Sequence, residues 1–125
     1  MERNWDTIRE ILIKLEEMEP EKGCIRLSDF PPDKAHEYSY HVELLIEADL
    51  IHGEMSKTFG THVSDFLAIR LTWKGHEFLD AIRSDTVWNK AKESFINGGV
   101  SMTFDLAKSV ATDIAAAYLK STVGS

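Results

Sequence analysis

Five histidines and one cysteine are the side chains of this chain best suited to hold a transition metal. His36, His41 and His52 lie in one short segment, but their spacing matches no zinc-binding pattern, and Cys24 has no second cysteine to assist it. On a helix, His36 and His41 are rotated by about 140° from each other, so they do not share a face. We therefore predict no metal site and no cofactor, and we expect His41 to be a packed histidine bonded to a carbonyl or carboxylate.

Motifs for nucleophilic or phosphate chemistry are also absent from the sequence. It contains no G-x-S-x-G, Walker A or G-x-G-x-x-G motif, and Asn97-Gly98-Gly99 is typical of a helix end. Adjacent carboxylates such as Glu16 and Glu17 are expected to be exposed helix charge. Cys24, beside a short apolar run, is expected to act as a small apolar side chain. We predict that the protein has no catalytic residue and is not an enzyme.

Composition limits the partners and the compartment. The chain has 125 residues, of which 43% are hydrophobic and 28% charged, a balance typical of one globular domain. A net charge of -7 argues against broad, charge-driven binding of nucleic acid. No apolar signal segment follows Met1, and no apolar run approaches the roughly 20 residues that span a bilayer. With its lone cysteine, the chain is expected to be cytoplasmic and free of the membrane.

Hydrophobic spacing predicts the elements that carry these residues. Asn4 and Thr72 are predicted helix caps, and a further cap is predicted at Ser84, Asp85 or Thr86. Gly75, inside a predicted helix, indicates close backbone packing. The polar residues 53–65 between two apolar runs predict a hairpin with a long tip. The predicted helices cover residues 4–19, 33–48 (a short turn, then a longer helix), 73–83, 85–97 and 101–120, and the predicted strands cover 24–27, 50–52 and 66–71.

This order of elements is that of a winged helix-turn-helix. The fold class is therefore predicted to be α+β and mostly helical, with a two- or three-stranded small sheet and a C-terminal helical extension. We place a winged-helix domain at residues 1–84 and C-terminal helices at 85–125, together forming one compact unit. The central expectation is that residues 50–71 fold back on themselves beside the helices.

Two sequence stretches carry a resemblance to known proteins. Residues 41–51, HVELLIEADLI, resemble the end of the third helix in many winged-helix proteins, and residues 71–79, LTWKGHEFL, resemble their entry to the helix after the wing. With residues 80–88, the chain resembles an uncharacterised family of bacterial and phage proteins, known only as a domain of unknown function. The resemblance covers nearly the whole chain and is strongest over residues 40–88. It implies a fold and a bacterial or mobile-element setting, but no catalytic residue.

If the fold is a winged helix, the helix within residues 33–48 and the wing form the contact surface. Residues 28–83 hold 10 acidic and 5 basic residues, so phosphates are repelled unless the charges segregate. The leading hypothesis is a regulator that binds DNA weakly and with strong salt dependence; the alternative is an acidic inhibitor or adaptor that engages a basic protein and not DNA. The candidate contact residues are Lys34, His36, Tyr38, Ser39, Lys57, Thr58 and His62.

The C-terminal helices have an apolar surface that needs a partner. Small residues along the last helix allow another helix to approach closely, either from the same domain or from a second copy of the chain. Both alternatives stay open, and we favour a homodimer slightly. The candidate dimerisation residues are Trp88, Phe95, Phe104, Ala107, Ala111, Ile114 and Tyr118.

Overall fold

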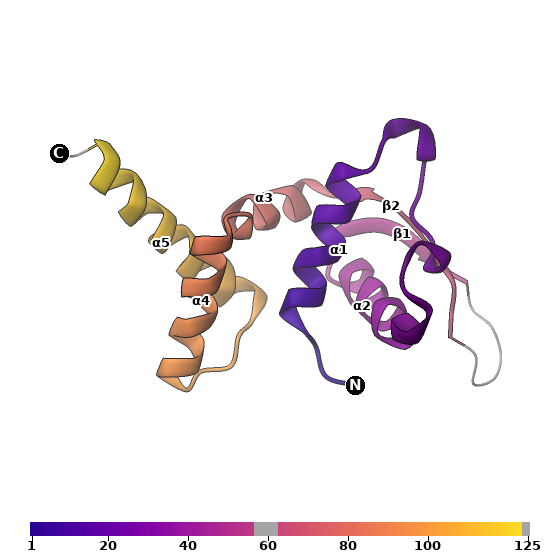
Figure 1. Cartoon of the computed structure of the whole chain (residues 1–125), viewed down its shortest axis with the longest axis horizontal. Coiled ribbons are helices and arrows are strands. Elements are labelled where there is room, and N and C mark those ends of the chain that lie inside the picture. The colour runs from indigo at the N-terminus through magenta and orange to yellow at the C-terminus, as the bar shows by residue number, and fades with distance from the viewer. Residues whose placement is uncertain (57–62, 124–125) are drawn as a thin grey trace. The chain divides into compact units, whose positions relative to one another are not determined.

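The computed structural model describes residues 1–56 and 63–123 of the chain (Figure 1). The described residues form five α-helices and one two-stranded antiparallel sheet, which confirms the mostly helical α+β class. They divide into two compact units, residues 1–76 and 77–125. This division falls between His76 and Glu77, whereas the division at residue 84 stays a prediction from the sequence.

Helix α1 (Trp5–Glu17) opens the first unit. The Asn4 side chain accepts hydrogen bonds from the backbone N–H groups of Asp6 (2.9 Å) and Thr7 (3.2 Å), which confirms the predicted cap. The apolar residues at three- and four-residue steps face the interior, as the spacing predicts. The buried apolar residues of this helix are Ile8, Ile11, Leu12 and Leu15.

Three short 3₁₀ helices, Pro20–Lys22, Leu27–Asp29 and Pro32–Lys34, lead from α1 to α2 (Ala35–Glu47). The last of them with α2 matches the predicted short turn followed by a longer helix. Asp49, at φ 61°, follows the end of α2 in the left-handed conformation, so the chain turns directly into the first strand.

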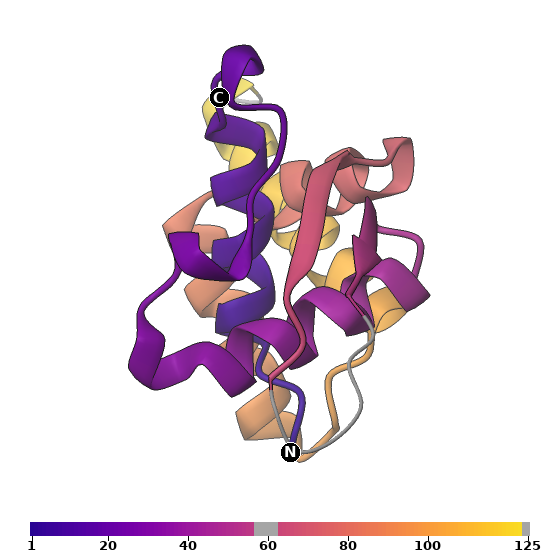
Figure 2. The ribbon, with the colours of Figure 1, turned by 90° about the vertical axis from the view of Figure 1, so that its right-hand side faces the viewer.

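The predicted hairpin is confirmed, because β1 (Ile51–Met55) pairs antiparallel with β2 (Phe66–Leu71). Figure 2 shows the two strands side by side. Ile25 adds one bridge to β2, with hydrogen bonds of 2.8 and 2.9 Å to the backbone of Ala68, where the sequence predicts a brief edge strand. Helices α1 and α2 both pack against this small sheet.

Helix α3 (Trp73–Ile82) follows β2 directly and is capped by Thr72, whose hydroxyl accepts the N–H of Gly75 at 2.9 Å. A methyl group added at Gly75 would lie 2.0 Å from the Leu50 carbonyl oxygen. The predicted close backbone packing at Gly75 is thus confirmed. The elements from α1 to α3 are compatible in order with a winged helix: helix, edge strand, helix, the two strands of a hairpin, helix.

The second unit contains α4 (Asp85–Gly98) and α5 (Phe104–Val123), which pack against each other. Ser84 caps α4 as predicted, and Gly99, at φ 65°, ends it. None of the helices in residues 1–56 and 63–123 is long and apolar enough to span a membrane.

Several predicted dimerisation residues are instead interior residues of this chain. The side chains of Trp88, Phe95, Ala107 and Ala111 are buried, so they cannot form a surface for a second copy, and the prediction is wrong for them. An apolar stripe at helical spacing indicates that another element covers the helix, but not whether that element belongs to the same chain or to a second copy. Here α4 and α5 cover each other. Phe104 is half-buried against Phe78, with ring centroids 4.7 Å apart, and Ile114 is half-buried; only Tyr118 is exposed.

Candidate partner-binding surface

Helix α2 divides its residues between the interior and the surface. Tyr38, Val42 and Leu45 are buried, as is His41. The residues opposite them recur at steps of four, three and four, so they form one outward stripe. The stripe consists of His36, Tyr40, Glu43 and Glu47, of which His36 and Glu47 are exposed and the other two half-buried. We call this stripe the α2 face.

Tyr38 is not a contact residue, which corrects the prediction. Its hydroxyl donates to both carboxylate oxygens of Glu10, at 2.8 and 2.9 Å, and its ring stacks on Phe30 with centroids 4.3 Å apart. Burial, together with the Glu10 carboxylate, raises the pKa of Tyr38 to about 12. Tyr38 therefore fastens α2 to α1 and stays neutral.

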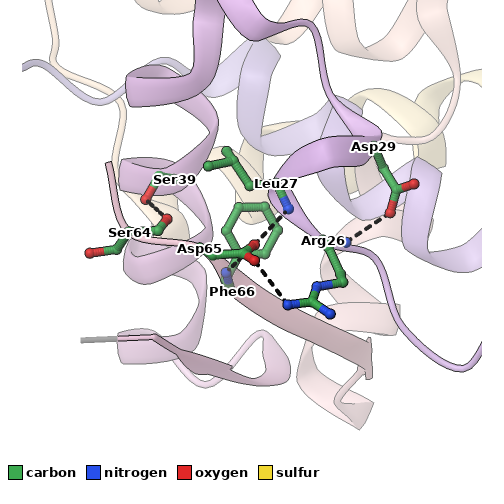
Figure 3. Close-up of polar contacts among 7 residues, drawn as sticks. All are labelled: Arg26, Leu27, Asp29, Ser39, Ser64, Asp65 and Phe66. Carbon is green, nitrogen blue, oxygen red and sulfur yellow. Dashed lines mark hydrogen bonds and ion pairs between the residues drawn. The ribbon is translucent and has the colours of Figure 1, made fainter. Parts of the chain in front are cut away.

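Ser39 is also buried, and its predicted role as a contact residue is wrong. Its hydroxyl donates to the Ser64 carbonyl at 2.7 Å (Figure 3). Ser64 lies just before β2, at the base of the hairpin loop. The bond therefore ties the base of the loop to the first half of α2.

Asp65 fixes the other side of the loop base. Its carboxylate accepts the N–H groups of Leu27 (3.1 Å) and Phe66 (2.8 Å) and pairs with the Arg26 guanidinium at 3.0 Å (Figure 3). Burial acts to raise the pKa of Asp65, but these donors outweigh it and hold that pKa below its ordinary value. The Asp65 carbonyl also accepts the N–H of Ser56, which closes the loop.

Asp29 is the centre of a second, smaller cluster of polar contacts beside that of Asp65. Its carboxylate accepts the backbone N–H of Arg26 at 2.8 Å and pairs with Lys22 at 2.9 Å. The Arg26 bond, with the Lys22 contact, lowers the pKa of Asp29. Two cations near the loop base, Arg26 and Lys22, are thus matched by carboxylates of the same unit. Neither aspartate is predicted as a site residue from the sequence, because a lone Asp among turn residues indicates only a turn.

His41 is the packed histidine that the sequence predicts. It is fully buried; its Nδ1 lies 2.7 Å from the Glu37 carbonyl, and its Nε2 accepts the backbone N–H of Asn4 at 2.7 Å. Because Nε2 accepts, the ring proton is on Nδ1 and is donated to Glu37. Within the described ranges, no three His, Cys, Asp or Glu side chains gather where they could hold a metal ion.

The remaining predicted contact residues divide into two groups. Lys34 and His36 are exposed at the start of α2, so they are available to a partner. Lys57, Thr58 and His62 lie outside the described residues. Lys34 and His36 thus lie at the N-terminal end of α2, and the carboxylates of the α2 face, Glu43 and Glu47, lie further along the helix.

Comparison with other proteins places the chain in a family. Residues 2–101 match a family model described as "Hypothetical protein (DUF2513)". An uncharacterized protein of Haemophilus influenzae is 40% identical over 114 residues, which cover 91% of this chain and 95% of that protein. No solved structure matches the chain.

Proposed function

This chain belongs to the hypothetical-protein family DUF2513, and from the geometry of its first unit we propose that it is a non-enzymatic interaction protein with a winged-helix shape. In this proposal α2 takes the place of the recognition helix, and β1 and β2 form the wing. The α2 face binds a basic protein partner. Membership of an uncharacterised family, which the resemblance implied, is confirmed; the binding role is our inference.

The observation that carries the proposal is the charge of the α2 face. On the outward stripe of the element that a winged helix offers to its partner, Glu47 is exposed and Glu43 is half-buried. Arg26 pairs with Asp65, and Lys22 pairs with Asp29. A protein binds the phosphate backbone through cations that neutralise phosphates and release the counterions condensed on the nucleic acid. Cations that are already paired with carboxylates do this poorly. A cationic protein surface meets the same face with complementary charge.

Residues 1–76 as a whole have a negative net charge, like the α2 face. They contain 15 acidic and 9 basic residues, a net charge of -6, whereas the full chain has -7. The field of the first unit therefore attracts basic partners and repels nucleic acid over distances of about one Debye length, ~8 Å at physiological salt.

One observation favours DNA as a second candidate. Lys34 and His36 are exposed at the N-terminal end of α2, and the Ser39–Ser64 bond brings the loop base beside that end. The N-terminal residues of a recognition helix are those that reach base edges. A DNA complex would therefore use this end of α2, and not Glu43 or Glu47.

Affinity measurements with two probes separate the candidates. An arginine-rich peptide is expected to bind the full chain, and Glu47→Lys is expected to weaken binding about five-fold. Glu17→Lys, which reverses an equally exposed carboxylate on α1, is the matched control and should change the affinity much less. Equal losses of peptide affinity in Glu47→Lys and Glu17→Lys would show that only net charge matters. If the chain binds duplex DNA and Lys34→Gln weakens that binding, the result would favour DNA as the partner.

A further inference from the structure

The second half of α5 has exposed apolar side chains. Leu119 and Val123 are 66% and 79% exposed, and Tyr118 is 40% exposed. The first half of the same helix is different, because Ala107 and Ala111 are fully buried. We propose that residues 112–123 of α5 bind the same segment of a second copy of this chain, so that the protein is a homodimer.

The exposed residues have the spacing of a helix-pairing seam. Thr112, Ala116, Leu119 and Val123 follow one another at steps of four, three and four, and all are exposed. This is the spacing with which two α-helices bury a common stripe. The seam differs from the one predicted from sequence, which included residues that the chain itself buries.

The same surface contains both protruding side chains and a hollow. A hollow of about 470 Å³ is lined by Ala115, Tyr118 and Leu119 of α5 together with Val87 and its neighbours Ser84 and Thr86. A two-fold interface requires a patch that fits itself, and here the exposed Leu119 side chain of one copy can enter the hollow of the other.

Charge favours a second copy over a charged protein. Residues 77–125 contain 6 acidic and 5 basic residues, so this unit has a net charge of only -1 and two copies can approach through it without strong repulsion. Asp113 and Lys120, both exposed, are seven residues apart and lie on one side of α5. In an antiparallel pair centred near Ala116, Asp113 of each copy lies close to Lys120 of the other.

Sedimentation equilibrium of the full chain over a range of concentrations tests the proposal. The wild type is expected to be a dimer, and Leu119→Asp is expected to weaken the dimer at least about ten-fold. Ile96→Asp is the matched control, since Ile96 is 79% exposed on α4 and lies outside the seam. It should leave the dimer unchanged.

Charge reversal then tests the antiparallel arrangement. Asp113→Lys and Lys120→Asp are each expected to weaken the dimer, and the double variant is expected to restore it. A wild type that is monomeric at its highest soluble concentration would overturn the proposal. A dimer unaffected by Leu119→Asp would overturn it equally, because the interface would then lie elsewhere. Neither outcome bears on the α2 face, which belongs to the other unit.

Discussion

Asp65 accepts a hydrogen bond from the backbone N–H of Leu27 at 3.1 Å, across 38 residues of sequence. With the Arg26 ion pair, this bond holds the start of β2 against the segment that precedes α2. The Ser39–Ser64 bond fixes the same place to α2. Ser64 and Asp65, which precede β2, are thus bonded to α2 on one side and to residues 26–27 on the other.

Asp65→Asn is expected to destabilise the first unit by about 1–2 kcal/mol, since an amide keeps one acceptor oxygen where the carboxylate serves three donors. Urea denaturation measures the change. Asp80→Asn is the control, because Asp80 pairs with Arg83 at the surface of α3, and the loss of this exposed pair should cost less than about 0.5 kcal/mol. Equal effects would show that the Asp65 cluster contributes no more than a surface ion pair.

Acid should weaken the fold through the same aspartates. The pKa values of Asp65 and Asp29 are lowered in the fold from an ordinary value of 3.8. Their contribution to stability is therefore fully present above about pH 4 and is lost as the pH falls through the lowered values. Stability measured against pH should fall less steeply in Asp65→Asn than in the wild type below pH 4. Identical slopes would contradict this assignment.

Alkali should act through Tyr38. Its pKa is raised from 10.0 to about 12 in the fold, so the folded state keeps the phenol neutral where the unfolded chain ionises. The contribution of Tyr38 is complete below pH 10 and is lost as the pH rises to about 12. Tyr38→Phe should remove a phenolate absorbance step near pH 12 and cost about 1 kcal/mol at pH 7 for the lost bond to Glu10. If an absorbance step near pH 12 persists in Tyr38→Phe, the step belongs to another tyrosine and the assignment to Tyr38 is wrong.

Gly75→Ala is expected to destabilise the protein by about 2 kcal/mol or more, because its methyl group would meet the Leu50 carbonyl oxygen. Gly98→Ala is the control on the same chain. Its methyl group would come no closer than 4.0 Å to the nearest side chain, and alanine favours a helix by about 1 kcal/mol over glycine. Thermal unfolding of both variants should show shifts of opposite sign. A neutral Gly75→Ala would mean that α3 can move away from Leu50.

Local signals predict the elements well. Phe66–Leu71 is predicted as a strand and found as one with the same bounds, because a continuous apolar run after polar turn residues has few other solutions. The caps at Asn4, Thr72 and Ser84 are likewise found, since each depends on a side chain within three residues of the helix start.

The sequence predicts side-chain environments less well. Tyr38 and Ser39 are polar residues on a helix proposed to meet a partner, yet both face the interior because Glu10 and Ser64 satisfy their hydroxyls. Trp88 and Ala111 form apolar stripes whose partner helix is decided by tertiary packing. Two of the three donors to the Asp65 carboxylate, in Leu27 and Arg26, come from residues 38 and 39 positions away, which no local pattern encodes.

Mapping of backbone amide NMR shifts tests the central claim, that the α2 face binds a basic protein partner. The full chain is titrated at low salt with an arginine-rich peptide and, separately, with duplex DNA. We predict that the peptide shifts the amides around Glu43 and Glu47, and that DNA at the same concentration shifts none of α2. Shifts at Lys34 and His36 with DNA, and none on α2 with the peptide, would contradict the claim.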